Sequence, residues 1–152
     1  MTLSLTSPAF DDGAPIPEKY GYTEANVNPP LTIDGVPDGT ASLALIMDDP
    51  DAMEPAGKVW DHWVVWDIDP ETQEIPEDWD AHAASATVGQ TDYGEQAYGG
   101  PNPPDHEHTY RFELYALESA LDLPDTAGAD ELRQAVKGVR LAEATLAGTY
   151  AP

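Results

Sequence analysis

The chain has 152 residues, of which 29 are Asp or Glu and six are Lys or Arg, so its formal charge at pH 7 is −23. A surface this acidic repels nucleic-acid backbones and anionic membranes, which excludes nucleic acid and stable membrane association from the expected partners. Apolar residues make up 41% of the chain and the acids are not gathered in a tail, so we expect a single folded domain over residues 1–152.

The same composition predicts where the protein works. Like charges destabilise a compact chain in dilute buffer, but at roughly molar salt the Debye length falls to about 3 Å and most of this repulsion is screened. We therefore expect a cytoplasmic protein from a salt-accumulating halophile. The absence of cysteine excludes disulfides and thiolate chemistry. The first residues lack the basic start and long apolar run of a signal peptide, and no run reaches the length of a membrane span.

The N-terminal third reads as short strands joined by proline-rich connections. Alternating apolar residues predict a first strand over residues 2–7. Residues 8–30 contain five prolines and little periodicity, which indicates a surface connection with one helical turn at residues 17–20. Residues 31–33 form a short predicted strand, and a turn at residues 35–39 follows it.

The central stretch predicts two neighbouring strands with an acidic turn between them. Residues 43–47 are an unbroken apolar run, typical of a strand covered on both faces. The run ends at residues 48–51, because proline lacks an amide hydrogen and aspartate favours turns. Residues 60–68 then resume as a strand, and alternation predicts a stripe on one face. That stripe comprises Trp60, His62, Val64, Trp66 and Ile68.

The rest of the chain adds a long loop, a strand, a helix and a last strand. Residues 67–104 lack regular signals, which fits either a surface loop or a functional one. Residues 108–117 alternate, with His108, Tyr110, Phe112, Leu114 and Ala116 on one face. Asp130 is predicted to cap a helix that ends at Gly138, and residues 144–150 form the final strand. The pattern predicts a mostly β fold, an antiparallel two-sheet β-sandwich with a short C-terminal helix at one end.

The candidate site combines polar residues at three strand ends. Asp49 and Asp51 end one strand, His62 starts the next, and His108 and Tyr110 start a third. A neighbouring carboxylate raises the pKa of an imidazole, whereas burial lowers it. Where the carboxylates prevail, one or two cationic imidazoles, the Tyr110 hydroxyl and the backbone amides of residues 99–100 would hold a small anion. The alternative is that each histidine is a satisfied core residue.

Several ordered segments carry a resemblance to a known family. They are LALIMDDPDAM, WDHWVVWDI and YGGPNPPDHEHTYRFELYALE, with the opening LTSPAFDDGAPIPEKY, the segment NVNPPLTIDGVPDGT and the Gly-Thr-Tyr ending. Together they resemble the phosphatidylethanolamine-binding protein family, and more closely its bacterial and archaeal Raf-kinase-inhibitor-like branch. The resemblance implies two antiparallel sheets, a small C-terminal helical element and a pocket for phosphate, carboxylate or phospho-head-group anions.

The resemblance also implies roles for individual residues. Asp49 and Asp51 match the two aspartates of the family's Asp-Pro-Asp-Ala-Pro motif, and His62 matches its pocket histidine. His108 and Tyr110 match its His-Arg-Tyr element. The remaining implied pocket residues are Trp60, which flanks the pocket, and Gly100 and Asn102 in the loop. The chain departs from the family pattern at four positions near the implied ligand or its loops: Met53 for proline, Asn102 for glycine or cysteine, His106 for glycine and Thr109 for arginine.

These residues favour a non-enzymatic binding protein for a small anionic ligand. By the same resemblance, a regulatory role with an unidentified protein partner and a homodimer are both open. One alternative is a small-substrate hydrolase or lyase, with Asp49 and His62 as acid and base. Another is a metal site using His106 and His108 with the nearby aspartates and His62, although a solvated loop explains His106 better. We expect neither a metal nor a cofactor.

Overall fold

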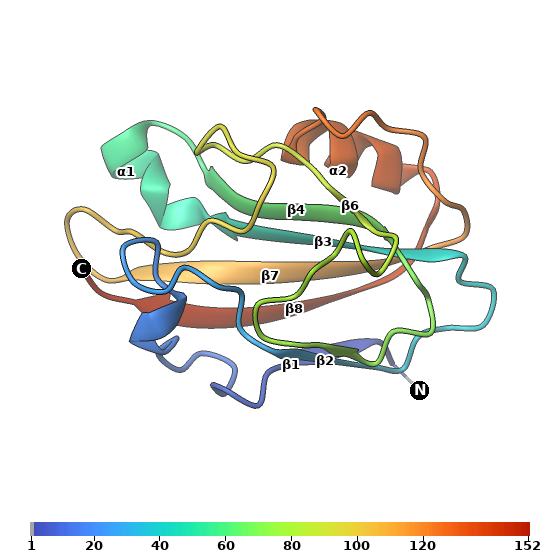
Figure 1. Cartoon of the computed structure of the whole chain (residues 1–152), viewed down its shortest axis with the longest axis horizontal. Helices are drawn as coiled ribbons and strands as arrows, with labels where there is room; N and C mark the ends of the chain where they lie inside the picture. Colours follow the sequence, from blue (N-terminus) through green and yellow to red (C-terminus); the bar gives the residue numbers. More distant parts are fainter. Residues whose placement is uncertain (1) are drawn as a thin grey trace.

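The strands form two antiparallel sheets, as predicted (Figure 1). The computed structural model describes residues 2–152, so Met1, which the predicted domain includes, lies outside the described residues. The smaller sheet has the order β1-β2-β5 and consists of β1 (Ser4–Thr6), β2 (Leu31–Asp34) and β5 (Glu74–Ile75). The larger sheet has the order β6-β4-β3-β7-β8 and consists of β6 (Thr87–Val88), β4 (Trp60–Ile68), β3 (Ser42–Asp49), β7 (His108–Leu117) and β8 (Arg140–Tyr150).

Short helical segments connect and cover the sheets. They are the 3₁₀ turns η1 (Glu18–Tyr20) and η2 (Pro50–Ala52), and the helices α1 (Met53–Ala56) and α2 (Ala129–Lys137). The turn η1 falls where a helical turn was predicted. Among residues 2–152, none of the helices has the length and apolar content that crossing a membrane requires.

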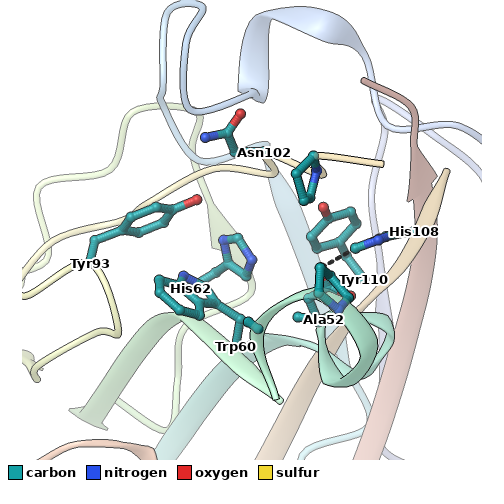
Figure 2. A pocket seen from close by; sticks show the side chains of 11 residues that line it. Ala52, Trp60, His62, Tyr93, Asn102, His108 and Tyr110 are labelled. Carbon is teal, nitrogen blue, oxygen red and sulfur yellow. Dashed lines mark hydrogen bonds and ion pairs between the residues drawn. The ribbon is translucent and has the colours of Figure 1, made fainter. Parts of the chain in front are cut away.

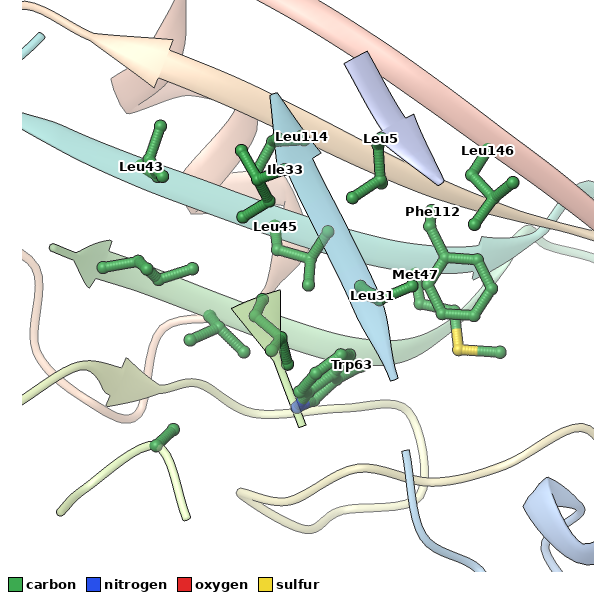
Figure 3. Packing of buried hydrophobic residues seen from close by; sticks show 14 of the residues in the cluster. Leu5, Leu31, Ile33, Leu43, Leu45, Met47, Trp63, Phe112, Leu114 and Leu146 are labelled. Carbon is green, nitrogen blue, oxygen red and sulfur yellow. The ribbon is translucent and has the colours of Figure 1, made fainter. Parts of the chain in front are cut away.

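The main core lies between the two sheets (Figure 3). Leu5 and Ile33 of the smaller sheet pack there with Leu45, Met47 and Phe112 of the larger one. A second cluster lies on the other face of the larger sheet, where Ile46 and Trp66 pack against Leu132 of α2. Strand β3 is therefore buried along its whole length, which confirms the prediction that both of its faces are covered. Each large apolar side chain buried in this way contributes about 1.5–3 kcal/mol to stability.

The C-terminal helix differs from its prediction in position and start. Helix α2 packs on the outer face of the larger sheet, and not at one end of the sandwich, because its apolar residues complete the second cluster. Its N-cap is Gly128, whose amide donates to the Glu131 carboxylate at 2.8 Å, so Asp130 is not the cap. The helix ends at Gly138 as predicted. Strand β8 starts at Arg140 because it pairs with β7 along almost its whole length.

The predicted stripe on β4 is wrong, because two bulges interrupt the alternation of its side chains. The pairing with β3 shifts by one residue around His62, and again near Asp67, whose φ is +55°. Trp60 and His62 consequently face the side of the smaller sheet, whereas Val64 and Trp66 face α2, and Ile68 returns to the main core. Bulges of this kind re-aim side chains and are frequent beside functional sites.

The two long connections are less irregular than the sequence suggested. The segment over residues 8–30 buries Phe10, Ile16 and Tyr20, so it closes the core instead of only crossing the surface. The segment over residues 67–104 contains β5 and β6, each too short to show a strand pattern in sequence.

Candidate functional site

Sheet order brings three strand ends to one edge of the larger sheet. Strand β3 lies between β4 and β7 and runs antiparallel to both, so its last residue meets their first residues. Asp49 is paired with Trp60, and Asp48 with Arg111, which places Asp49 beside the start of β7. Residues that are 59 positions apart in sequence can therefore touch, as Asp49 and His108 do.

A cavity of about 190 Å³ opens at this edge (Figure 2). Most of its wall is aromatic or apolar, with the Asp49 carboxylate and the imidazoles of His62 and His108 as buried polar groups. The complete lining is Asp49, Ala52, Pro55, Ala56, Trp60, His62, Tyr93, Asn102, Pro104, His108 and Tyr110. Six of the residues predicted from sequence are thus brought together: Asp49, Trp60, His62, Asn102, His108 and Tyr110.

The tautomer of His62 follows from its one hydrogen bond. Its Nδ1 lies 2.8 Å from the Gly99 carbonyl oxygen, and because a carbonyl can only accept, Nδ1 carries the proton. Burial lowers the pKa of His62 below its usual value, although the Gly99 carbonyl and the Asp49 charge oppose this. The ring is therefore neutral at pH 7 and Nε2 keeps its lone pair. The prediction of a cationic imidazole does not hold for His62.

His108 has the opposite character, because carboxylates engage both of its ring nitrogens. Nδ1 lies 2.6 Å from Asp49 Oδ2, and Nε2 lies 2.8 Å from Asp105 Oδ1. Burial lowers the pKa of His108, but the bonds to Asp49 and Asp105 outweigh burial and raise it overall. In this arrangement both nitrogens donate, so the ring is an imidazolium whose two N–H groups are already used within the protein. His108 contributes charge to the cavity wall but no free donor.

Two lining residues, Trp60 and Tyr110, have a buried polar atom without a hydrogen-bond partner among the residues that the structure describes: Nε1 of Trp60 and the hydroxyl of Tyr110. Tyr110 itself is fully buried. Burial raises the pKa of this hydroxyl well above its usual value, so it stays protonated and can donate. Its ring lies edge-on to His62, with ring centres 5.2 Å apart. A buried hydroxyl without a partner costs free energy, which a bound acceptor would recover.

Two predicted residues do not line the cavity. The Asp51 side chain is exposed and accepts a hydrogen bond from the Thr109 amide at 2.8 Å, so it ties the turn to β7. The Gly100 amide donates to the Asn26 side chain at 2.8 Å, and the Gly99 amide donates to the His62 carbonyl at 2.9 Å. The expected anion hole of backbone amides is therefore wrong, because both amides are satisfied inside the protein.

Sequence reasoning missed the aromatic wall at Tyr93. This residue lies in the loop between β6 and β7, packs edge-on to His62 and Trp60, and stacks on Tyr22 at 4.0 Å between ring centres. Its hydroxyl donates to the Gly100 carbonyl at 2.9 Å, which holds the loop over the cavity. Nothing in the spacing of residues around Tyr93 signals this position, because the loop has no periodic pattern.

Comparisons with known proteins identify the family to which this chain belongs. The family described as Phosphatidylethanolamine-binding protein matches residues 6–151, and the chain belongs to that family. A UPF0098 protein of Methanothermobacter thermautotrophicus is 41% identical over 151 residues, covering 97% of this chain and 98% of its own. A protein of Mycobacterium tuberculosis with the provisional name lipoprotein LppC is 41% identical over 150 residues, covering 97% of this chain and 72% of its own.

Solved structures agree with the fold. The crystal structure of a Chlamydia trachomatis protein described as a phosphatidylethanolamine-binding protein homologue has a TM-score of 0.91 and 36% identity, covering 98% of this chain and 97% of its own. The Escherichia coli protein YbcL, described as a member of the mammalian family, has a TM-score of 0.89 and 27% identity, covering 99% and 98%. Because one relative is named as a lipoprotein, the cytoplasmic location stays a prediction. The halophilic origin and the homodimer also stay predictions.

Proposed function

We propose that the cavity binds a small ligand through a phosphate or carboxylate group, and that the protein acts by binding and not by catalysis. The observation that carries this proposal is the buried Tyr110 hydroxyl, a donor without a partner in a cavity of about 190 Å³. Family membership supports a binding protein of this kind.

The charges of the cavity define which form of the ligand fits. Its imidazolium, His108, is offset by Asp49 and Asp105, and neither lysine nor arginine lines the wall. Nε2 of His62 is an acceptor and the Tyr110 hydroxyl is a donor, so the complementary group both accepts and donates. A singly protonated phosphate does so, because it keeps acceptor oxygens beside one P–OH group, whereas an ionised carboxylate would use the Tyr110 donor alone. We therefore expect the monoanion to bind in preference to the dianion.

Inorganic phosphate tests the proposal directly. Calorimetric titration at roughly molar salt should give binding to the parent protein, and Tyr110→Phe should weaken it about tenfold or more, since hydrogen bonds to charged groups are worth about 1.5–3 kcal/mol. Tyr115→Phe is the matched control, because Tyr115 is buried on the opposite face of β7. Phosphate that binds Tyr110→Phe as tightly as the parent would refute the proposal.

A second candidate function rests on the state of His62. A neutral imidazole with Nδ1 fixed by a carbonyl and Nε2 free has the arrangement of a general base. A hydrolase or lyase acting on a small ester or phosphoester would use it to activate water. A substrate screen at high salt that compares the parent with His62→Ala tests this candidate. If both proteins turn over every substrate at the same background rate, the catalytic candidate is wrong.

A further inference from the structure

Beside the cavity, three residues converge that the binding function does not use together. Asp105 and His106 lie in the loop that precedes β7, and His108 is the first residue of that strand. One carboxylate lies between the two imidazoles: Asp105 Oδ1 is 2.8 Å from His108 Nε2, and Asp105 Oδ2 is 3.1 Å from His106 Nδ1. One ligand atom from each residue falls within 4.8 Å of the other two.

We propose that Asp105, His106 and His108 form a binding site for a divalent transition ion such as Zn²⁺. Two imidazole nitrogens and one carboxylate oxygen form a donor set that such ions prefer, whereas Mg²⁺ and Ca²⁺ require mainly oxygen ligands. Three protein ligands would leave one position of a tetrahedral ion open to water or to another ligand. This site shares the His108 side chain with the pocket of the proposed function, but it does not depend on that function.

The ring geometry agrees with this donor set. The rings of His106 and His108 have centres 5.0 Å apart and are inclined at 67°. Two imidazoles bound to one tetrahedral ion at about 2.1 Å have ring centres roughly 5 Å apart and ligand atoms roughly 3.4 Å apart. The two contacts of Asp105 need to widen only slightly to reach that spacing. Asp105 and His106 are exposed loop residues, so they are free to make this adjustment.

The buried partner of His108 supplies an independent argument. The Nδ1 atom of His108 lies 2.6 Å from Oδ2 of Asp49, and both side chains are almost fully buried. A histidine that binds a metal commonly donates its other ring N–H to a carboxylate, which fixes the ring and the tautomer. Here Asp49 holds the proton on Nδ1, so an ion can replace the proton on Nε2. His108 is thus pre-oriented, with the nitrogen that would bind the ion directed at Asp105.

An ion at this site would lie beside the cavity wall. His108 is part of the cavity wall, and His106 lies outside that wall, so the ion would be bound at the outer side of the His108 ring. The positive charge of the ion would lie near the cavity wall, where Asp49 is the carboxylate of the lining. Substitution of Asp105 or His106 would therefore remove the ion site while every residue of the cavity lining stays in place.

Equilibrium dialysis of protein without a polyhistidine tag tests the site, with Zn²⁺ or Co²⁺ measured by mass spectrometry. Roughly molar salt screens unspecific attraction by the acidic surface. We expect saturation at one ion per chain, and the visible absorption of a four- or five-coordinate Co²⁺ ion with nitrogen ligands. His106→Ala and Asp105→Asn should each weaken binding at least about tenfold.

His82→Ala is the matched control, because His82 is an exposed histidine in another part of the chain. It should bind the ion as the parent does. The proposal is overturned if His106→Ala binds as tightly as the parent, or if uptake rises without saturating at one ion. Phosphate binding measured with a chelator present should persist in His106→Ala, so failure of the metal site and failure of the phosphate pocket are distinguishable.

Discussion

The Nδ1 atom of His108 lies 2.6 Å from Oδ2 of Asp49, and both side chains are buried. The pair joins β3 to β7 at the edge of the sheet where the cavity opens. Asp49 Oδ1 also accepts from the Asp51 amide at 2.9 Å, which fixes the start of η2. This one carboxylate therefore orients both the imidazolium and the turn that forms another part of the cavity wall.

Removing Asp49 should destabilise the protein strongly. Asp49→Ala leaves a buried imidazolium with one carboxylate partner, and losing one member of a buried ion pair costs about 3–5 kcal/mol. We expect a loss of about 3 kcal/mol in the free energy of unfolding, measured by urea denaturation at roughly molar salt. Asp105→Asn is the control, because Asp105 is exposed, and its effect should be far smaller. Equal losses in the two variants would contradict the dominant role of Asp49.

A second buried carboxylate, Asp48, predicts non-additive effects of two arginines. Asp48 is fully buried and accepts two bonds of 2.9 Å from Arg111 and one of 2.7 Å from Arg133 of α2. Arg111→Met or Arg133→Met leaves one cation and should cost about 1–2 kcal/mol. The double variant leaves the charge unpaired, so its cost should exceed the sum by at least about 1 kcal/mol.

A double-mutant cycle in urea measures this coupling. Arg140→Met serves as control, since the Arg140–Glu143 pair is exposed on both sides and should contribute at most about 1 kcal/mol. If the losses of unfolding free energy caused by Arg111→Met and Arg133→Met are additive, the buried Asp48 carboxylate does not require at least one arginine, and the prediction is wrong.

The sequence was sufficient for the strand pattern but not for contacts that depend on pairing. Alternation in residues 108–117 correctly placed Tyr110 and Phe112 on one face, because β7 pairs with both of its neighbours without a register shift from His108 to Ala116. On β4 the same argument failed, since a bulge is a property of two paired strands and leaves no mark in the spacing of one. Asp48 looked like a turn residue because its partner Arg133 lies 85 positions away.

The candidate site, too, could be predicted only in part from the sequence. Family motifs identified Asp49, His62 and His108, whose positions follow from the ends of three strands. The charge of each histidine could not be predicted, because it depends on whether a carbonyl or a carboxylate faces the ring. Tyr93 could not be predicted as a lining residue, because tertiary contacts alone determine the position of this loop residue.

The net charge of −23 predicts that salt stabilises the fold. Raising the salt concentration from about 0.1 M to 1 M shortens the Debye length from about 10 Å to 3 Å, so repulsion among exposed carboxylates weakens. We expect the melting temperature to rise with potassium chloride over this range, measured by circular dichroism. Sucrose at matched osmolality is the control, because it does not screen charge. An equal rise in sucrose would contradict electrostatic screening as the cause.

Asp61 should make stability fall as the pH rises toward neutrality. Burial, followed by repulsion from Asp92, raises the pKa of Asp61 to about 6, although Arg133 opposes this, and Oδ1 has no hydrogen-bond partner among residues 2–152. A raised folded-state pKa means that the folded protein binds this proton more tightly, so its stabilising effect is present below about pH 4 and is lost between about pH 4 and pH 6. Asp61→Asn lacks this loss, so its free energy of unfolding should exceed that of the parent by up to about 3 kcal/mol at pH 7.5. Urea denaturation should show that this difference shrinks toward pH 4. Asp122→Asn removes the same charge from an exposed position and should show no such pH-dependent gain. If the stability of Asp61→Asn and that of the parent change in parallel with pH, the Asp61 carboxylate is not destabilised in the folded protein and the prediction is wrong.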